Sequence, residues 1–191
     1  VADMLLQTIS QRPTLKLRTE TSSSKISIPD CYNGCFDVDL AIYDANYNVH
    51  TAIPVKMNMV SINKNRFNNA NTIIGETARS LPACDPNRNV LFINFTPEIT
   101  LCETNSYFKV EKVNKTDTKL AYSSPIYNQE YIADHVAIID INYQLNLDLH
   151  SINTKSDLYT ALMEHDNPIS LSPGTLDSFN LYCTNFLSKN P

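Results

Sequence analysis

The side chains of this chain that could carry out chemistry are first of all its five cysteines and four histidines. Cys31 and Cys35 have the spacing of one half of a zinc site, in which thiolates bind the metal. The other half is missing, because the histidines are scattered through the sequence rather than set at ligand spacing. An odd number of cysteines also argues against a complete disulfide framework. We therefore expect free thiols, no metal site and no cofactor.

A cysteine–histidine pair is a second arrangement that could be catalytic. Cys31, Cys35 or Cys84 could act as the nucleophile, with His50 or His135 as the base. No segment around these residues resembles a nucleophile elbow or an oxyanion loop, and three glycines leave little material for either. We rank this hypothesis last and expect a protein that is not an enzyme.

Asp37 and Asp39 are a third candidate, a carboxylate pair of the kind that binds metals or works in acid–base catalysis. They alternate with Phe36, Val38 and Leu40, and a period of two is typical of a strand with one buried face. A single strand is predicted over residues 36–43. The two aspartates are then interpreted as part of its solvated face.

Short strands joined by turns are predicted in much of the remaining chain. They cover residues 14–18, 25–28, 55–62, 90–95, 107–113 and 139–149. The run 90–95 is contiguous and apolar apart from Asn94, as in a strand buried on both faces. Residues 63–89 are polar and rich in asparagine, and they predict a loop with a helical turn at 75–80. Residues 115–134 are interpreted as a long polar insertion.

The pattern changes after residue 150. Apolar residues spaced three and four apart, such as Phe179, Cys183 and Phe186, predict an amphipathic helix after a shorter one that begins near Ser156. The fold class predicted is mainly β, an antiparallel β-sandwich of jelly-roll type over residues 1–150. Residues 151–191 are predicted to be a C-terminal helical appendage that packs on the same domain.

Composition bounds the size and the partners of the protein. The chain has 191 residues, 42% of them hydrophobic, which is enough for one real core. Its formal net charge of -5 does not suit a nucleic-acid binder with a broad basic face. The densest basic group is Arg12, Lys16, Arg18 and Lys25, which can form only a local patch.

Export and membrane signals are weak in the sequence. Two acceptor sequons begin at Asn94 and Asn114, but chance matches are common and neither is taken as evidence of secretion. The chain has no signal-peptide apolar region and no apolar run long enough to span a bilayer. Because it begins at Val1, we expect a processed product or an excised domain.

The order of elements between residues 36 and 149 carries the only family resemblance. The matching pieces are the end of the strand at 59–62, the polar segment 64–66, the segment 73–75 with Gly75, the strand 90–95, the segment 96–101 and a long final strand from Ile139. In this order the chain resembles the thirty-kilodalton movement-protein superfamily of plant viruses.

That resemblance implies a jelly-roll-like β-sandwich and a non-enzymatic function. The protein would bind viral single-stranded nucleic acid or nucleoprotein, form homo-oligomers, and act with host plasmodesmal or membrane-associated proteins. Its implied location is the host cytoplasm and plasmodesmata. The residues proposed to contact nucleic acid are Lys64, Arg66, Arg79 and Arg88.

Two other functions fit the same predicted strands. A jelly-roll capsid or other virion structural protein would self-assemble through large apolar interfaces. A partner-binding β-sandwich module, such as a secreted viral decoy, would show an even set of disulfides and occupied sequons.

Overall fold

The structure is a computed structural model of the chain and describes residues 2–10, 12, 14–21, 24–80, 88–105, 107–127 and 135–189. Its centre is a mixed seven-stranded sheet. In spatial order the strands are β1 (Lys16–Thr19), β4 (Leu40–Tyr43), β5 (Val49–Ile53), β7 (Asn89–Pro97), β10 (Val136–Leu145) and β11 (Ile169–Leu171). The seventh strand, β6 (Val55–Met57), follows β5 after Pro54 and also pairs with β7.

The sheet changes direction along its width. β1, β4 and β5 form an antiparallel meander. β7, in contrast, runs parallel to each of its neighbours β5, β6 and β10. Parallel neighbours need long crossover connections. Helices α2 (Ile62–Ser80) and α3 (Lys115–Tyr127) lie in these connections. Two hairpins stand apart from the sheet, β2–β3 (Ile26–Pro29 and Cys35–Val38) and β8–β9 (Ile99–Glu103 and Phe108–Lys112).

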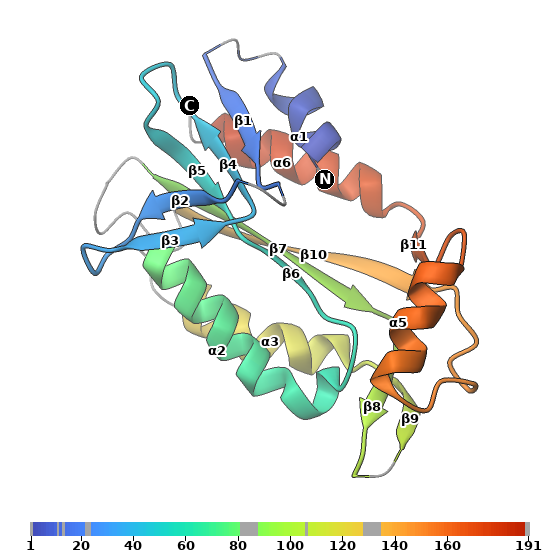
Figure 1. Cartoon of the computed structure of the whole chain (residues 1–191). Helices are drawn as coiled ribbons and strands as arrows, with labels where there is room; N and C mark the ends of the chain where they lie inside the picture. The colour runs from blue at the N-terminus through green and yellow to red at the C-terminus, as the bar shows by residue number, and fades with distance from the viewer. Residues whose placement is uncertain are drawn as a thin grey trace.

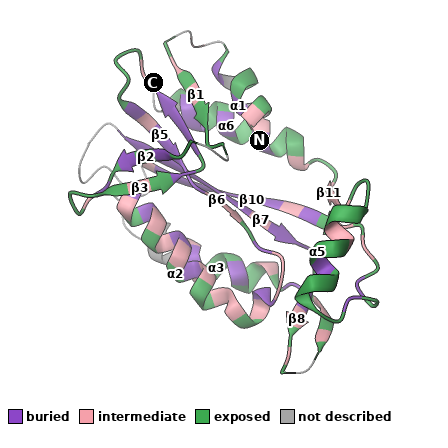
Figure 2. Ribbon diagram, in the orientation of Figure 1, coloured by how far each residue is buried: buried purple, intermediate pink, exposed green. Residues whose placement is uncertain are grey.

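Helices cover both faces of the sheet (Figure 1). On one face α2 and α3 bury Ile73 and Tyr122 against Val90 and Phe92 of β7. On the opposite face lie α1 (Ala2–Ile9) and α6 (Thr175–Lys189), which pack against the other side of β7 and β10. The buried residues therefore concentrate in the central strands and on the inner sides of the helices (Figure 2).

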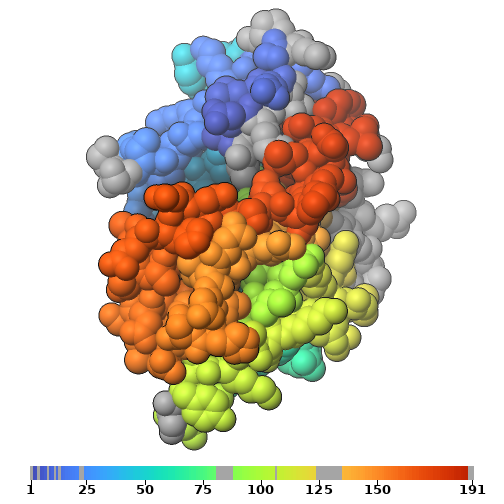
Figure 3. All heavy atoms as spheres, turned by 90° about the vertical axis from the view of Figure 1, so that its right-hand side faces the viewer, coloured from blue at the N-terminus to red at the C-terminus, as the bar shows by residue number. Residues whose placement is uncertain are grey.

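The C-terminal segment is attached to the same sheet. α6 buries Phe179 and Cys183 in the main core, and β11 pairs with β10. α5 (Lys155–Glu164) buries Leu158 in a smaller cluster with Leu101 of β8. The side of the molecule that carries these elements is seen in Figure 3, with α5 and α6 in orange to red and α3 in yellow.

The fold-class prediction is confirmed only as far as a strand-rich chain is concerned. A jelly-roll sandwich is not confirmed, because the main sheet is mixed and is covered by helices rather than by a second sheet. The mostly apolar run 90–95 is indeed buried on both faces within β7. Such runs are typical of parallel strands between helical layers. β7 is indeed parallel to β5, β6 and β10, so the predicted antiparallel arrangement is wrong for this strand.

The largest local error concerns residues 62–80. They were predicted to be strand end, polar loop and turn, but they form the 19-residue helix α2, with Gly75 inside it. Asparagine is a poor helix former, so the composition hid the helix. Its buried residues Ala70, Ile73 and Thr77 are spaced three and four apart, and packing against the sheet supplies the stability that propensity does not.

Three further boundaries differ from the predictions. The strand predicted at 36–43 is broken at Asp39 into β3 and β4, which belong to different sheets. The strand predicted at 55–62 ends at Met57. Within the insertion predicted at 115–134, residues 115–127 form α3, and the last predicted strand begins and ends earlier, as β10.

Candidate active site

The four basic residues assigned to nucleic-acid contacts do not form one patch. Lys64 and Arg66 lie in the first turns of α2, and Arg79 lies in its last turn. A rise of 1.5 Å per residue puts Lys64 and Arg79 about 22 Å apart along the helix. Arg88 follows at the start of β7 and is 3% exposed, so it has no surface to offer a phosphate.

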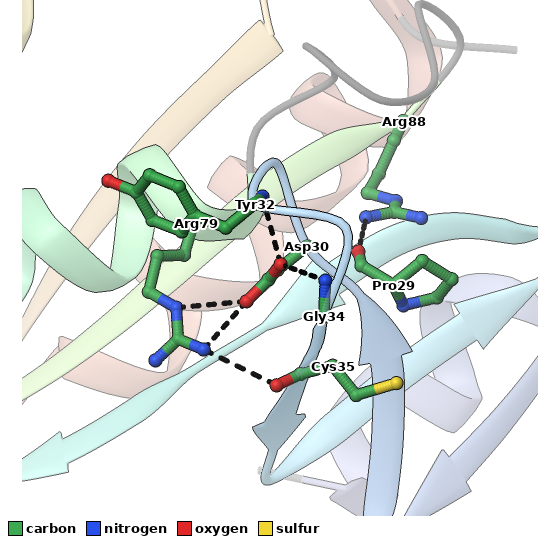
Figure 4. Close-up of polar contacts among 7 residues, drawn as sticks. All are labelled: Pro29, Asp30, Tyr32, Gly34, Cys35, Arg79 and Arg88. Atoms are coloured by element: carbon green, nitrogen blue, oxygen red, sulfur yellow. Dashed lines mark hydrogen bonds and ion pairs between the residues drawn. The ribbon is translucent and has the colours of Figure 1, made fainter.

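Arg79 holds the β2–β3 hairpin to α2 (Figure 4). Its Nη2 and Nε lie 2.7 Å and 3.2 Å from Oδ2 of the buried Asp30. The other carboxylate oxygen, Oδ1, accepts hydrogen bonds from the backbone of Tyr32 and Gly34. The Arg79 guanidinium and these backbone donors hold the pKa of Asp30 below its usual value. This arrangement explains Arg79 as a structural residue.

Arg88 does similar work at the neighbouring residue of the hairpin, Pro29. Its Nη1 donates a hydrogen bond of 2.6 Å to the carbonyl oxygen of Pro29 (Figure 4). Of the four predicted contacts, Lys64 alone is fully exposed, while the Arg66 guanidinium lies over the Phe67 ring. The structure therefore separates these residues by role as well as by position.

A different set of charged residues, Asp39, Lys56 and Glu76, interacts electrostatically around the start of β6. Asp39 lies at the break between β3 and β4, and its Oδ2 accepts a 2.7 Å hydrogen bond from the backbone N–H of Val55. Val55 follows Pro54, where β5 gives way to β6. The break between β3 and β4 therefore lies next to the break between β5 and β6, and the Asp39 carboxylate bridges the two.

Lys56 comes directly after this point. It is paired in register with Asn94 of β7, and paired residues on neighbouring strands project to the same face. Asn94 has the same parity along β7 as Val90 and Phe92, which pack under α2 and α3. The half-buried side chain of Lys56 therefore points to the α2 side.

Glu76 reaches the same place from α2. It lies one turn after the buried Ile73 and is itself half-buried. Burial raises the pKa of Glu76, the positive charges of Lys56 and Arg79 lower it, and the negative charge of Asp39 raises it. Lys56 and Asp39 are therefore close enough to Glu76 to act on its protonation. Two carboxylates and one ammonium group from three elements share a small region of the surface.

Sequence reasoning missed this group. Asp39 was assigned to a solvated strand face, Lys56 to an ordinary strand, and Glu76 to a turn. The available signal was the Ala70–Ile73–Thr77 spacing, which would have revealed α2 and placed Glu76 on its inner side. The proline before Val55 also marked the strand break.

The cysteine and histidine hypotheses find little support. The candidate nucleophiles Cys31 and Cys35 are free thiols of the β2–β3 hairpin, Cys31 partly exposed and Cys35 exposed. Cys183, which was not a candidate, is fully buried, and burial raises the pKa of its thiol to about 12. Cys84 lies outside the described residues. His135 Nδ1 lies 3.2 Å from Asn89 Oδ1, and His50 Nδ1 lies 2.8 Å from Thr51 Oγ1. No group of three or more Asp, Glu, His or Cys side chains within the described residues is arranged to hold a metal ion.

Comparisons with models of protein families, with curated protein sequences and with solved structures gave no match for this chain. In the described part of the chain, no helix is both long and apolar enough to cross a membrane. The function is therefore argued from the geometry of the site.

Proposed function

We propose that the chain is a divalent-cation-dependent phosphodiesterase that hydrolyses nucleic acid, with Asp39, Lys56 and Glu76 as its active site. The observations that carry this proposal are the hydrogen bond that fixes the Asp39 carboxylate next to β6 and the electrostatic interaction of Glu76 with Lys56 and Asp39. The proposal departs from the expectation of a non-enzymatic protein without a metal.

The donor set suits magnesium. Mg²⁺ is usually held by one or two carboxylates, keeps several waters and takes substrate phosphate oxygens as further ligands. Asp39 and Glu76 supply two carboxylates, and Oδ1 of Asp39 remains when Oδ2 is occupied by Val55. Two carboxylates do not form a site made entirely of protein ligands, so waters and substrate oxygens would complete the coordination of the ion.

Each residue has a role in hydrolysis. Asp39 and Glu76 would hold the cation, which would supply polarisation of the phosphoryl group and activation of water. The ammonium group of Lys56 faces the negative charge that grows on the phosphoryl oxygens as water attacks. The water oxygen bonds to phosphorus, one phosphorus–oxygen bond breaks, and the departing oxygen takes up a proton.

A local basic edge favours nucleic acid as the substrate. Lys16 and Arg18 of β1 pair in register with Tyr43 and Ala41 of β4, so they lie on the same face as Asp39. The Lys16 ammonium group sits 4.9 Å from the centre of the exposed Tyr47 ring. A cation beside an exposed ring can bind a phosphate and a stacked base. The three residue steps of β1 place Lys16 about 10 Å from the end of the strand nearest Asp39.

The movement-protein function remains a second proposal, which rests on the resemblance in sequence over residues 36–149, although segments 64–66 and 73–75 of that resemblance lie in α2. It shares nucleic acid as a ligand and differs in the absence of cleavage. A capsid-like protein would instead assemble into large closed particles.

The test is a cleavage assay with fluorescent single- and double-stranded DNA and RNA, in buffer with Mg²⁺, Mn²⁺ or a chelator. We expect cleavage that requires the cation and falls about 100- to 1,000-fold in Lys56→Met. Asp39→Asn and Glu76→Gln should fall at least as far, while Asp117→Asn on the exposed surface of α3 should not change. Cation-independent binding without cleavage would favour the movement-protein function and refute this one.

A stability measurement checks the metal site independently. Burial raises the pKa of Glu76, so ionised Glu76 destabilises the metal-free protein as the pH rises above the unfolded-state value. Glu76→Gln should therefore leave the melting temperature in chelator unchanged or raised. It should also abolish the increase that Mg²⁺ or Mn²⁺ causes in the wild type. A cation-induced increase that survives in this variant would contradict the assignment of Glu76.

A further inference from the structure

Three polar residues form a row across the sheet beside the proposed active site. Lys56, Asn94 and Asp140 are paired in register on β6, β7 and β10, so their side chains project to the α2 and α3 side. Asn94, in the middle, is 1% exposed. A buried amide therefore separates an ammonium group on one strand from a carboxylate on another.

The hydrogen bonds of Asn94 are directed away from Lys56. Its Nδ2 donates to Oδ1 of Asp140 at 2.9 Å and to the hydroxyl of Thr96 at 3.2 Å. Its Oδ1 accepts a 2.8 Å hydrogen bond from Nδ2 of Asn58. Both donors and the acceptor are thus engaged by neighbours other than Lys56.

The charge of Asp140 is balanced from the far side. Tyr122 of α3 donates a hydrogen bond to Oδ1 of Asp140. Lys119 of α3 lies 3.7 Å from Oδ2, which is an ion-pair distance but longer than a hydrogen bond. Asp140 therefore finds its partners on α3 and β7 without drawing on Lys56.

The residue type at position 94 is constrained by both neighbours. A carboxylate there would lie beside Lys56 and pair with its ammonium group. An apolar side chain would remove one hydrogen bond from each of Asp140 and Asn58. Asparagine passes hydrogen bonds across the sheet without carrying charge. Lys56 itself makes no hydrogen bond or ion pair within the described residues, so it is not already neutralised.

We propose that Asn94 is a positioning residue that insulates Lys56 from Asp140 and so leaves the ammonium group available to Asp39, Glu76 and the substrate phosphate. This inference rests on the proposed function for its catalytic meaning, but the insulation itself can be measured without catalysis.

The experiment exchanges the two side chains in the double variant Asn94→Asp/Asp140→Asn. The exchange keeps the composition, the net charge and a hydrogen-bonding pair, and it moves the carboxylate one strand closer to Lys56. Two quantities are measured: cleavage of DNA with Mg²⁺, and the rate at which Lys56 is acylated by an amine-specific reagent, read by peptide mass spectrometry. Only the unprotonated amine reacts, so pairing with a carboxylate slows labelling.

We expect the double variant to label Lys56 about tenfold more slowly, the change that corresponds to one pKa unit, and to lose kcat while KM is retained. A merely structural role for Asn94 predicts wild-type values in both assays, and that result would overturn the proposal. The single variant Asp140→Asn removes the carboxylate of the row and places no charge at position 94. It should fold even if the exchange does not. It should leave Lys56 labelling unchanged, and a changed rate would also overturn the proposal. If the wild type does not cleave nucleic acid, the proposed function fails while the labelling comparison still decides the insulation.

Discussion

The packing of Ile73 decides whether α2 can hold Glu76 at the site. Ile73 is 1% exposed and lies one turn before Glu76, against Val90 and Phe92. Replacing a buried isoleucine by alanine costs about 2–5 kcal/mol, because it removes apolar contacts and leaves a cavity. In a chain of this length each kcal/mol lowers the melting temperature by about 2–4 °C. Ile73→Ala should therefore lower it by about 4–20 °C.

The control is the same substitution at the next residue. Ile74 is on the same helix but only partly buried, so Ile74→Ala gains the same few tenths of a kcal/mol of helix propensity and loses less burial. Urea unfolding followed by far-ultraviolet circular dichroism gives the free energy of unfolding for each variant. Equal losses at the two positions would refute the packing of α2 on β7 described above, and with it the placement of Glu76.

Three further predictions concern the surroundings of the site. Because the pKa of Asp30 is held low by Arg79, its contribution to stability is present above the unfolded-state pKa and is lost as the pH falls through the folded-state value. Asp30→Asn should thus be less stable than wild type in urea at about pH 7, with the gap closing toward about pH 2, and a constant gap would contradict the ion pair. Tyr143→Phe should cost about 1–3 kcal/mol in the same assay, since it leaves the buried carbonyl oxygen of Asn58 without its hydroxyl donor; a neutral effect would speak against that bond. Lys16→Gln should weaken nucleic-acid binding and lower the slope of log K against log salt by about 1, whereas an unchanged slope would remove Lys16 from the binding surface.

Sequence reasoning found the elements whose structure follows from the apolar pattern of their own residues. The run 90–95 is apolar apart from Asn94 and is buried on both faces as predicted. The spacing of Phe179, Cys183 and Phe186 correctly predicts α6. Fold class required one more step. A strand buried on both faces needs a layer on each side, and the layer on one side is α2, whose asparagine-rich surface reads as a loop. Because that helix was not predicted, a second sheet was assigned as the layer that packs on this strand.

The candidate site could not be predicted in the same way, because its three charged residues are brought together by topology. Asp39 and Lys56 meet only because β4 and β5 are paired, and Glu76 joins them only because α2 crosses over the sheet to β7. Each of the three is unremarkable in its own segment. The four basic residues chosen from sequence were selected for charge alone, and the fold uses two of them, Arg79 and Arg88, to fasten a hairpin.

The interruptions in the strands explain how the Asp39 carboxylate comes to lie next to β6. In a regular ladder the N–H of Val55 would bond to a neighbouring strand, and the side chain at position 39 would only follow the alternation of its strand. Pro54 supplies no N–H but its carbonyl oxygen still accepts a 2.9 Å hydrogen bond from Ile93, so β7 spans the break while the β4 side opens. The freed N–H of Val55 then takes Asp39 as its partner, which fixes a carboxylate beside Lys56 and leaves its second oxygen available. The alternation of apolar and polar residues does not reveal such breaks. It therefore predicts the strands of the sheet better than the residues that lie at their interruptions.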